Sequence, residues 1–284
     1  MGRIRGTASD GARLRAKLLT VLFRMDDRSE RRKNRRMKSQ SPPGMQVHVA
    51  PNFELMSRWA VAHIRNVLRV KPDALVGLAT GGSPLRTYQL LAGMAAREPR
   101  RFRAIRILKL DEWGGLDMND PATCESYLQR HVLQPWGVKT DRYFGWNSRP
   151  KNPAVECGRV ARWLERHGPM DLCILGLGLN GHLLLNEPGA ALTAAPHVAR
   201  LSPESKRHAM LQQARSRPRY GLTIGLAGIL QSRRILLLVS GAKKARQLKR
   251  LVNGPLTTQC PASFLQLHPN LTIVCDAAAA GGLK

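Results

Sequence analysis

Short apolar runs alternate with amphipathic segments along most of this chain. Strand-like runs, either continuously apolar or alternating apolar and polar, occur at residues 45–50, 74–79, 105–110, 143–146, 171–175, 235–239 and 271–276. Apolar residues at helical spacing lie between them, at residues 53–68, 85–96, 121–136, 154–167, 242–254 and 261–270. Strands that alternate with helices predict an α/β fold, with helices on both faces of a mostly parallel central sheet.

Residues 1–44 do not follow this pattern. They hold thirteen Lys or Arg residues against four acidic residues, and residues 31–38 are a mostly basic run. Like charges repel one another, so we predict a basic disordered tail, or a translation start placed too early, with Met37 or Met45 as the functional first residue. A nucleic-acid-binding arm and an organellar presequence are the alternatives, and the acidic residues argue against the presequence. We place the folded domain at residues 45–284.

The formal net charge of +27 and the pI near 11.3 are typical of proteins that bind nucleic acid or an anionic surface. Outside the tail, however, the basic residues are scattered, and aromatic residues make up only 5% of the chain. Platforms for single-stranded nucleic acid need aromatic faces on which bases stack. The pattern therefore favours a solvated basic surface and disfavours a nucleic-acid partner.

Cysteine usage and hydropathy bear on the compartment. The five cysteines form no CxxC pair and no metal-ligand spacing with histidine. Cys173 and Cys275 fall in strand-like runs, where a small buried thiol is the ordinary explanation. No apolar run reaches the roughly 18 residues that a membrane-spanning helix needs. We therefore predict a protein of the reducing cytoplasm, without a metal site or a membrane contact.

The most informative stretch is MDLCILGLGLNGHLLLNEPG, residues 170–189. An apolar run ends there in a glycine-rich loop, and ligands of open α/β sheets bind beyond the carboxyl ends of the strands. The loop carries Asn180, His182, Asn186 and Glu187. A turn could bring the Glu187 carboxylate to the His182 imidazole, which would fix one tautomer of the ring and raise its basicity. The alternative is an ordinary junction with a capping histidine and a solvated glutamate.

Three further strand ends carry polar residues. The second strand-like run is followed by Thr80, Gly81, Gly82 and Ser83. Pro84 then predicts the start of a helix with a hydroxyl group at its N-cap. Such a turn is a natural binding site for a phosphate, and an ordinary packing turn is the alternative.

Asp111 and Glu112 end the third strand-like run. A carboxylate in a cleft can act as a general base, although closing a loop by hydrogen bonds is an equal alternative. Lys243 and Lys244 fall in the first turn of a helix, where the helix dipole disfavours cations. A lysine at that position suggests an anion opposite, and a basic surface helix is the alternative.

Residues 190–219 are polar and irregular, with three prolines. A segment of this length between ordered elements has the size of a functional lid. We therefore expect a mobile lid at about residues 190–219.

Four strand-end motifs, LATGGSP, LDEW, GLGLNGHLLLNEPG and SGAKKA, together resemble those of the glucosamine-6-phosphate deaminase and galactosamine-6-phosphate isomerase family, over about residues 46–276. The 6-phosphogluconolactonases of the wider superfamily share parts of this set but generally lack the ending found at residues 186–189. The segments KLDEWGGL, DPATCESYL and PASFLQLH are similar to the galactosamine-6-phosphate branch. The resemblance implies a Rossmann-like fold of the sugar-phosphate isomerase type.

The resemblance also implies roles for the central residues. Asp111 would move a proton between C1 and C2 of the sugar, and Glu112 would be structural. His182 would assist opening of the pyranose ring, and Glu187 would orient and charge-balance His182. Asn180 occupies a position at which some members of the family carry Asp.

For the phosphate group, the resemblance implies a site formed by Thr80, Gly81, Gly82 and Ser83, with Lys244 as countercharge. The lid of this family carries an arginine that aligns near Lys206 in this chain, and Arg207 could substitute for it. The resemblance implies no cofactor and no metal.

The sequence therefore predicts a cytoplasmic hexosamine-6-phosphate deaminase of amino-sugar catabolism. It would convert galactosamine 6-phosphate or glucosamine 6-phosphate to the ketose phosphate and ammonia by acid–base isomerisation. The first alternative is a sugar-phosphate lactonase in which His182 activates water. The second is an inactive sugar-phosphate sensor that binds nucleic acid through its basic tail. The C4 epimer and a homo-oligomeric state stay open.

Overall fold

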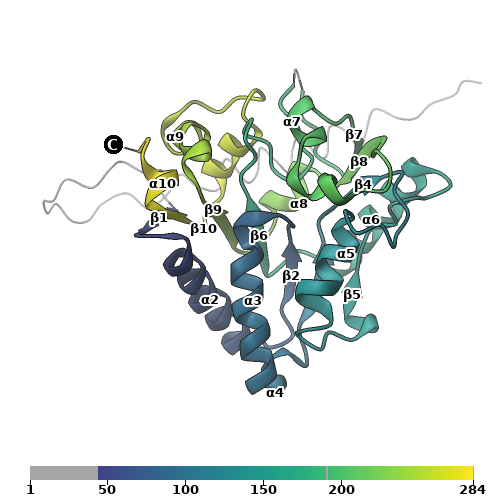
Figure 1. Ribbon diagram of the computed structural model, residues 1–284, viewed down its shortest axis with the longest axis horizontal. Coiled ribbons are helices and arrows are strands. Elements are labelled where there is room, and N and C mark those ends of the chain that lie inside the picture. The colour runs from purple at the N-terminus through teal and green to yellow at the C-terminus, as the bar shows by residue number, and fades with distance from the viewer. Residues whose placement is uncertain (1–43, 190, 284) are drawn as a thin grey trace, which may run out of the picture. The chain divides into compact units, whose positions relative to one another are not determined.

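The computed structural model describes residues 44–189 and 191–283 and is built on a central parallel sheet (Figure 1). Within these residues, the sheet has seven strands in the order β1-β10-β9-β6-β2-β3-β5. They are β1 (Met45–Ala50), β2 (Leu75–Leu78), β3 (Arg106–Lys109), β5 (Tyr143–Phe144), β6 (Leu172–Gly176), β9 (Ile235–Val239) and β10 (Leu271–Asp276). All neighbouring pairs in this sheet are parallel, which confirms the predicted fold class. Residues 1–43 of the predicted tail lie outside the described residues.

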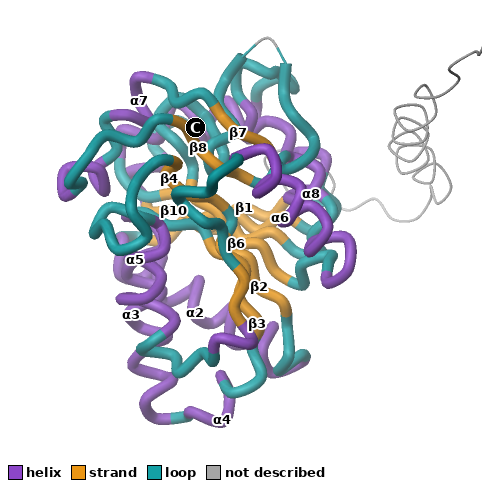
Figure 2. Tube along the Cα trace, turned by 90° about the vertical axis from the view of Figure 1, so that its right-hand side faces the viewer, coloured by secondary structure: helices purple, strands orange, loops and turns teal. Residues whose placement is uncertain are grey.

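Two hydrophobic cores cover the two faces of this sheet. Alternate residues of a strand point to opposite faces, so Leu236 and Leu238 of β9 enter one core while Leu237 enters the other. The first core is closed by α2 (Phe53–Val70), α3 (Gly82–Arg97), α4 (Pro99–Phe102), α5 (Cys124–Leu128) and η1 (Gln129–Leu133). The second is closed by α6 (Pro153–His167), α8 (Leu226–Leu230), α9 (Ala245–Asn253), η5 (Pro261–Leu267) and α10 (Ala277–Ala280). Figure 2 shows α2 and α3 on one side of β2 and β6, and α6 and α8 on the other.

A second, antiparallel sheet was not predicted from the sequence. It has the order β4-β8-β7, formed by β4 (Asp111–Gly114), β8 (Tyr220–Thr223) and β7 (His197–Ala199). Asp111 therefore begins a new strand and does not simply end the third one. A small core of its own, which includes Trp113, Leu185 and Leu201, lies beneath this sheet.

The segment at residues 190–219 is more regular than predicted. Besides β7, it contains α7 (Pro203–Lys206) and the 3₁₀ turn η3 (Ala209–Gln213). The prediction of an irregular segment was wrong because pairing with β8 and capping by Ser202 give it structure that its prolines do not reveal. Its mobility stays a prediction.

Several predicted element ends are shifted. α3 has Gly81 at its N-cap and starts at Gly82, so neither the predicted hydroxyl cap nor Pro84 at the first position is correct. The predicted helix 121–136 begins only after the Thr123 cap, as α5, and continues in π-helical form as η1. Residues 277–280, for which no element was predicted, form α10, because the Asp276 carboxylate accepts a hydrogen bond from the Ala279 N–H.

The strand order places a crevice between β2 and β6. The chain proceeds from β2 outward to β3 and β5, whereas after β6 it proceeds in the opposite direction to β9 and β10. Where the winding direction reverses, the flanking connections separate and leave room at the carboxyl ends of the strands. None of the helices in the described part of the chain is long and apolar enough to cross a membrane.

Candidate active site

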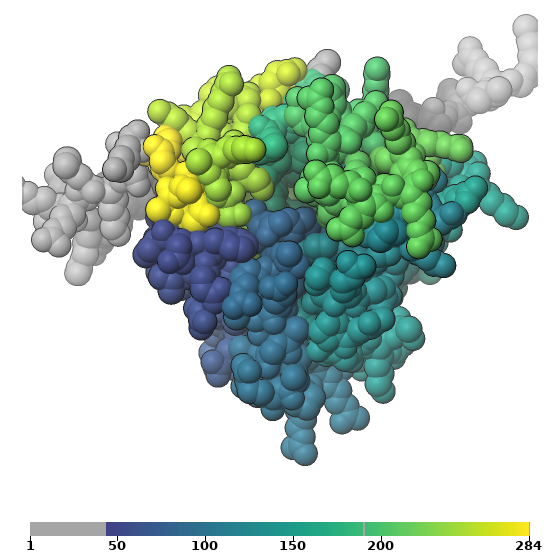
Figure 3. All heavy atoms as spheres, viewed as in Figure 1, coloured from purple at the N-terminus to yellow at the C-terminus, as the bar shows by residue number. Residues whose placement is uncertain are grey.

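One cavity of about 460 Å³ opens at the carboxyl ends of β2 and β6. Figure 3 shows the region above it, where the green atoms around α7 face the yellow-green atoms of α9 above the blue atoms of α3. The cavity is lined by seven of the residues expected from the sequence: Thr80, Gly81, Gly82, Ser83, Asp111, His182 and Lys244. Segments separated by up to 164 positions in the chain thus contribute to one cavity.

One end of the cavity is formed by the turn between β2 and α3. Gly81 has φ +114°, a conformation that disfavours side chains, and α3 starts directly after it. Ser83 Oγ lies 3.0 Å from Ser240 Oγ and accepts a hydrogen bond of 3.1 Å from Lys244 Nζ. Burial lowers the pKa of Lys244 to about 8, against the influence of Asp276. Helix N–H groups, hydroxyls and this lysine suit a phosphate.

Asp111 is a nearly buried acid in the cavity wall, 8% exposed. Burial and, to a smaller extent, the nearby Glu112 charge raise the pKa of Asp111 to about 7, although Lys109 acts in the opposite direction. The Cys124 thiol lies 4.0 Å from Asp111 Oδ1. A carboxyl group that titrates near neutral pH can both accept and return a proton, which general acid–base catalysis requires.

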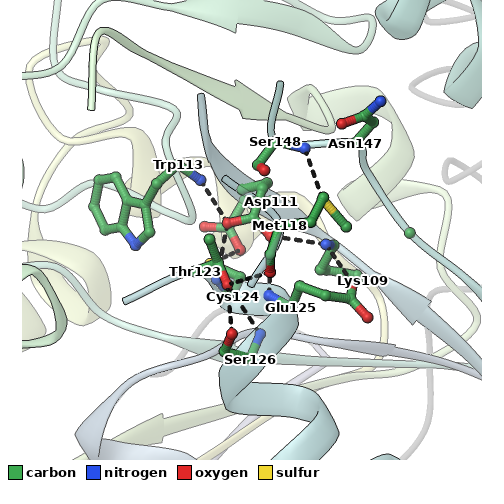
Figure 4. Close-up of polar contacts among 12 residues, drawn as sticks. Lys109, Asp111, Trp113, Met118, Thr123, Cys124, Glu125, Ser126, Asn147 and Ser148 are labelled. Atoms are coloured by element: carbon green, nitrogen blue, oxygen red, sulfur yellow. Dashed lines mark hydrogen bonds and ion pairs between the residues drawn. The ribbon is translucent and has the colours of Figure 1, made fainter. Parts of the chain in front are cut away.

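A buried polar network fixes the backbone next to Asp111 (Figure 4). Glu112 accepts hydrogen bonds from Lys109 Nζ at 2.7 Å and from the N–H groups of Trp113, Cys124 and Glu125 at 2.8, 2.8 and 2.9 Å. Lys109 Nζ also donates to Glu125 at 2.6 Å. Glu112 thus joins β4 to the first turn of α5 and is turned away from the cavity, as expected for a structural residue.

His182 and Glu187 form a pair in the loop after β6. His182 Nδ1 lies 3.3 Å from Glu187 Oε2, to which Asn180 Nδ2 also donates at 3.1 Å. Asn180 Oδ1 accepts the His182 backbone N–H at 3.1 Å. Although burial favours the neutral acid, hydrogen bonds from His182, Ser205 and Asn180 lower the pKa of Glu187 to about 2. Glu187 and Asn180 do not line the cavity, so they contact its contents only through His182.

The glycines of this loop allow His182 to take its place. A Cβ atom on Gly178 would lie 2.2 Å from the His182 ring, so any side chain there would displace the imidazole. Gly181 has φ +91°, and its carbonyl accepts a hydrogen bond from Ala262 N. Leu184, with φ 56°, is the one non-glycine residue of the described chain with a left-handed backbone, and it lines the cavity. Such strain often marks a functional site.

The segment formed by residues 202–208, which we call the α7 segment, closes over the histidine–glutamate pair. The Ser202 N–H donates to Glu187 Oε1 at 3.3 Å, and the Ser205 hydroxyl donates to the same oxygen. Lys206 is exposed and lies outside the cavity, in a neighbouring hollow with Ser202 and Pro203, so this geometry does not support its expected contact with phosphate. Arg207, the proposed substitute, lines the cavity.

Trp113, Ser205 and His208 belong to the site but were not identified from the sequence. Trp113 and His208 line the cavity, with ring centroids 5.7 Å apart. The LDEW motif contained a signal for Trp113, since it follows the acidic pair directly. Ser205 and His208 carry no recognisable signal, because they reach the site through the fold of a segment without a motif.

The chain is similar to known proteins over most of its length. Residues 53–274 match the family model described as glucosamine-6-phosphate isomerases/6-phosphogluconolactonase. The chain is 40% identical over 228 residues to AgaI of Escherichia coli K12, which is named as a deaminase, covering 80% of this chain and 90% of that protein. It is 35% identical over 246 residues to a glucosamine-6-phosphate deaminase of Bacillus velezensis. This match covers 84% of this chain and 100% of that protein.

Solved structures show the same architecture. A monomeric glucosamine-6-phosphate deaminase of the NagB superfamily superposes with a TM-score of 0.80 at 34% identity, covering 84% of this chain and all of that one. The 6-phosphogluconolactonase of Trypanosoma brucei, at 19% identity and a TM-score of 0.71 over 86% of this chain and all of that one, shares the fold.

The fold and the cavity define an α/β protein in which a glycine-rich turn at a helix start, a lysine, a buried carboxyl group and an imidazole line one cavity. The chain belongs to the glucosamine-6-phosphate isomerase/6-phosphogluconolactonase family.

Proposed function

We propose that this protein is a hexosamine-6-phosphate deaminase. It converts galactosamine 6-phosphate or glucosamine 6-phosphate to tagatose or fructose 6-phosphate and releases ammonia. The observation that carries the proposal is that Asp111, His182 and the β2–α3 turn line one cavity. The deaminase names of the relatives at 40% and 35% identity support the same activity.

The phosphate group would bind at the β2–α3 turn. The N–H groups at the start of α3, the Ser83 hydroxyl and the Lys244 ammonium converge there. Arg207 on the α7 segment lines the same cavity and adds a second cation. Because this group is remote from the bonds that change, its binding energy serves to orient the sugar.

His182 would open the pyranose ring. The ring oxygen must gain a proton while the C1 hydroxyl loses one, and a histidine can carry out both transfers near neutral pH. Glu187, held ionised by its hydrogen bonds, fixes the ring through Nδ1 and leaves Nε2 for the substrate. Asn180 holds both residues in place, because it donates a hydrogen bond to Glu187 and accepts one from the His182 backbone N–H.

Asp111 would then move the proton that converts the aldose into a ketose derivative. In the open-chain form it takes the proton from C2, which gives an enolamine, and returns it to C1, which leaves an imine at C2. Water adds to this imine, and the C2–N bond breaks to give the ketone and ammonia. Closure of residues 190–219 over the intermediate would limit contact with bulk water.

The proposal also covers the C4 epimer of the substrate and the cellular compartment of the reaction. The segments similar to the galactosamine-6-phosphate branch include β4 and the start of α5, which meet around Glu112 beside Asp111. We therefore favour galactosamine 6-phosphate. A phosphorylated sugar does not cross a membrane unaided, so we place the reaction in the cytoplasm. One solved relative is described as monomeric, and light scattering would decide between a monomer and a homo-oligomer here.

The deciding experiment measures ammonia release from both amino sugar phosphates with the full chain and with a chain that begins at Met45. We expect turnover of both, faster with galactosamine 6-phosphate, and equal activity of the two chains. Hydrolysis of 6-phosphogluconolactone without ammonia release would instead establish the lactonase alternative. Salt-sensitive DNA binding by the full chain only, without turnover, would establish the sensor alternative.

A further inference from the structure

His208 lines the same cavity as the β2–α3 turn and His182. Its Nε2 and Cε1 atoms lie 3.7 and 3.8 Å from the position that a Cβ atom on Gly81 would take. The ring packs against Trp113, at 5.7 Å between centroids and an angle of 43°. His208 therefore faces the glycine of the β2–α3 turn, at the end of the cavity that holds Ser83 and Lys244.

A backbone hydrogen bond sets which ring nitrogen of His208 carries the proton. His208 is the N-cap of η3, and its Nδ1 accepts the Met210 N–H at 3.3 Å. An accepting Nδ1 leaves the proton of a neutral imidazole on Nε2. Within the described residues, Nε2 makes no hydrogen bond, so the cavity wall presents one free N–H donor next to Gly81.

The surroundings of His208 keep it neutral. Burial and, to a smaller extent, the neighbouring His182 and Lys244 lower the pKa of His208 to about 4. At neutral pH the ring is thus a donor without charge, beside Lys244 and Arg207, which supply the positive charge. A neutral donor adds a directed hydrogen bond without a third cation repelling these two.

We propose that His208 Nε2–H donates a hydrogen bond to a phosphate oxygen of the substrate, and that His208 is thereby a phosphate-binding residue contributed by the α7 segment. The inference rests on the proposed function, because it takes a sugar phosphate as the occupant of the cavity. His208 lies against Gly81 of the β2–α3 turn, where the phosphate would bind. The sugar hydroxyl groups would extend from this turn toward Asp111 and His182, so His208 is placed to contact the phosphate and not a hydroxyl group.

His208→Asn separates this role from a structural one. Asparagine is a good N-cap and can keep the bond to the Met210 N–H, but its side chain is too short to place a donor at the Nε2 position. We expect the KM for both amino sugar phosphates, and the Kd for inorganic phosphate measured by calorimetry, to rise about tenfold, the size of one hydrogen bond to a charged group. The kcat should stay within about twofold, because a hydrogen bond to the phosphate stabilises the bound substrate and the transition state equally.

The matched control is His197→Asn, on β7 in the same part of the chain but outside this cavity, and it should leave KM and Kd unchanged. His208→Gln, which extends an amide donor toward the Nε2 position, should recover part of the lost affinity. In the wild-type chain, inorganic phosphate should also shift the ¹⁵N resonance of His208 Nε2, a measurement that does not depend on how well a variant folds.

Three results would overturn the inference. They are an unchanged Kd for phosphate in His208→Asn, a change in the preference between the two C4 epimers without a change in that Kd, and an unperturbed His208 resonance on addition of phosphate. The second result would assign His208 to a sugar hydroxyl. If the wild-type chain binds phosphate through His208 but releases no ammonia, the proposed function fails while the phosphate contact stands.

Discussion

The Ser205 hydroxyl donates a hydrogen bond to the Glu187 carboxylate, which in turn faces His182 Nδ1 at 3.3 Å. The α7 segment is thereby coupled to the imidazole that we assign to ring opening. A change at any of the three residues should affect the same step of the reaction.

Glu187→Gln tests this coupling. The amide keeps the size of the side chain but removes the charge that stabilises a protonated His182, so we expect kcat to fall by about 10²-fold with a KM change below about threefold. Steady-state ammonia release measures both constants. Glu165→Gln, an exposed position on α6, is the control and should behave as the wild type. A larger effect on KM than on kcat would place Glu187 in substrate binding.

The pH dependence of the reaction should report Asp111. Its pKa of about 7 means that the base form is lost as the pH falls, so kcat/KM should decline by about tenfold per pH unit below about 7. Asp111→Asn should abolish turnover, since a carboxamide cannot take the proton, while phosphate still binds. A flat profile between pH 5 and 8 with a fully active chain would remove Asp111 from the mechanism.

The raised pKa of Asp111 also predicts a stability effect. Between about pH 4 and 7 the native chain holds a proton that the unfolded chain releases, so this stabilising contribution is present at low pH and lost as the pH rises through 7. The carboxamide of the Asp111→Asn variant stays neutral throughout. This variant should therefore match the wild type at pH 4 and exceed its free energy of unfolding by roughly 2–4 kcal/mol at pH 8. Urea denaturation at both pH values measures the difference.

Gly178→Ala should displace His182, to which we assign ring opening. The new Cβ atom would lie 2.2 Å from the His182 ring, so the ring or the loop must move, and we expect at least about a 10²-fold loss of kcat/KM. Gly93→Ala in α3 is the control, because its Cβ atom would meet only the end of the Arg97 side chain at 3.7 Å. Equal activity of the two variants would show that the close approach of Gly178 and His182 has no functional importance.

Lys244 and its neighbour Lys243 allow a paired test of the phosphate site. Lys244 lines the cavity and donates to Ser83, whereas Lys243 is exposed and lies outside it. Lys244→Ala should raise KM by about 10²-fold, and Lys243→Ala should leave it unchanged. Since the pKa of Lys244 is about 8, phosphate affinity of the free enzyme should weaken above that pH in the wild type and not in Lys244→Ala.

Much of the fold could be predicted from the sequence because its signals are local. The continuously apolar runs that became β6 and β9 are buried on both faces of the sheet, and such strands need no partner to be recognised. The small antiparallel sheet was missed because its strands are short and come from three separate regions, so only the packing of β8 between β4 and β7 makes them a sheet.

For the site, the sequence by itself determined the strand-end motifs, and with them Asp111, His182 and the β2–α3 turn. Glycines and polar residues at the ends of buried strands must face the same edge of a parallel sheet, whatever the rest of the chain does. Only the tertiary structure decided which residues of the α7 segment contribute. α7 ends at Lys206, and its orientation on Glu187, set by the hydrogen bonds of Ser202 and Ser205, leaves Lys206 outside the cavity. The backbone then leaves the helix through Arg207 and His208, and both residues line the cavity. These contacts join segments far apart in the chain, so no local pattern in the sequence could reveal them.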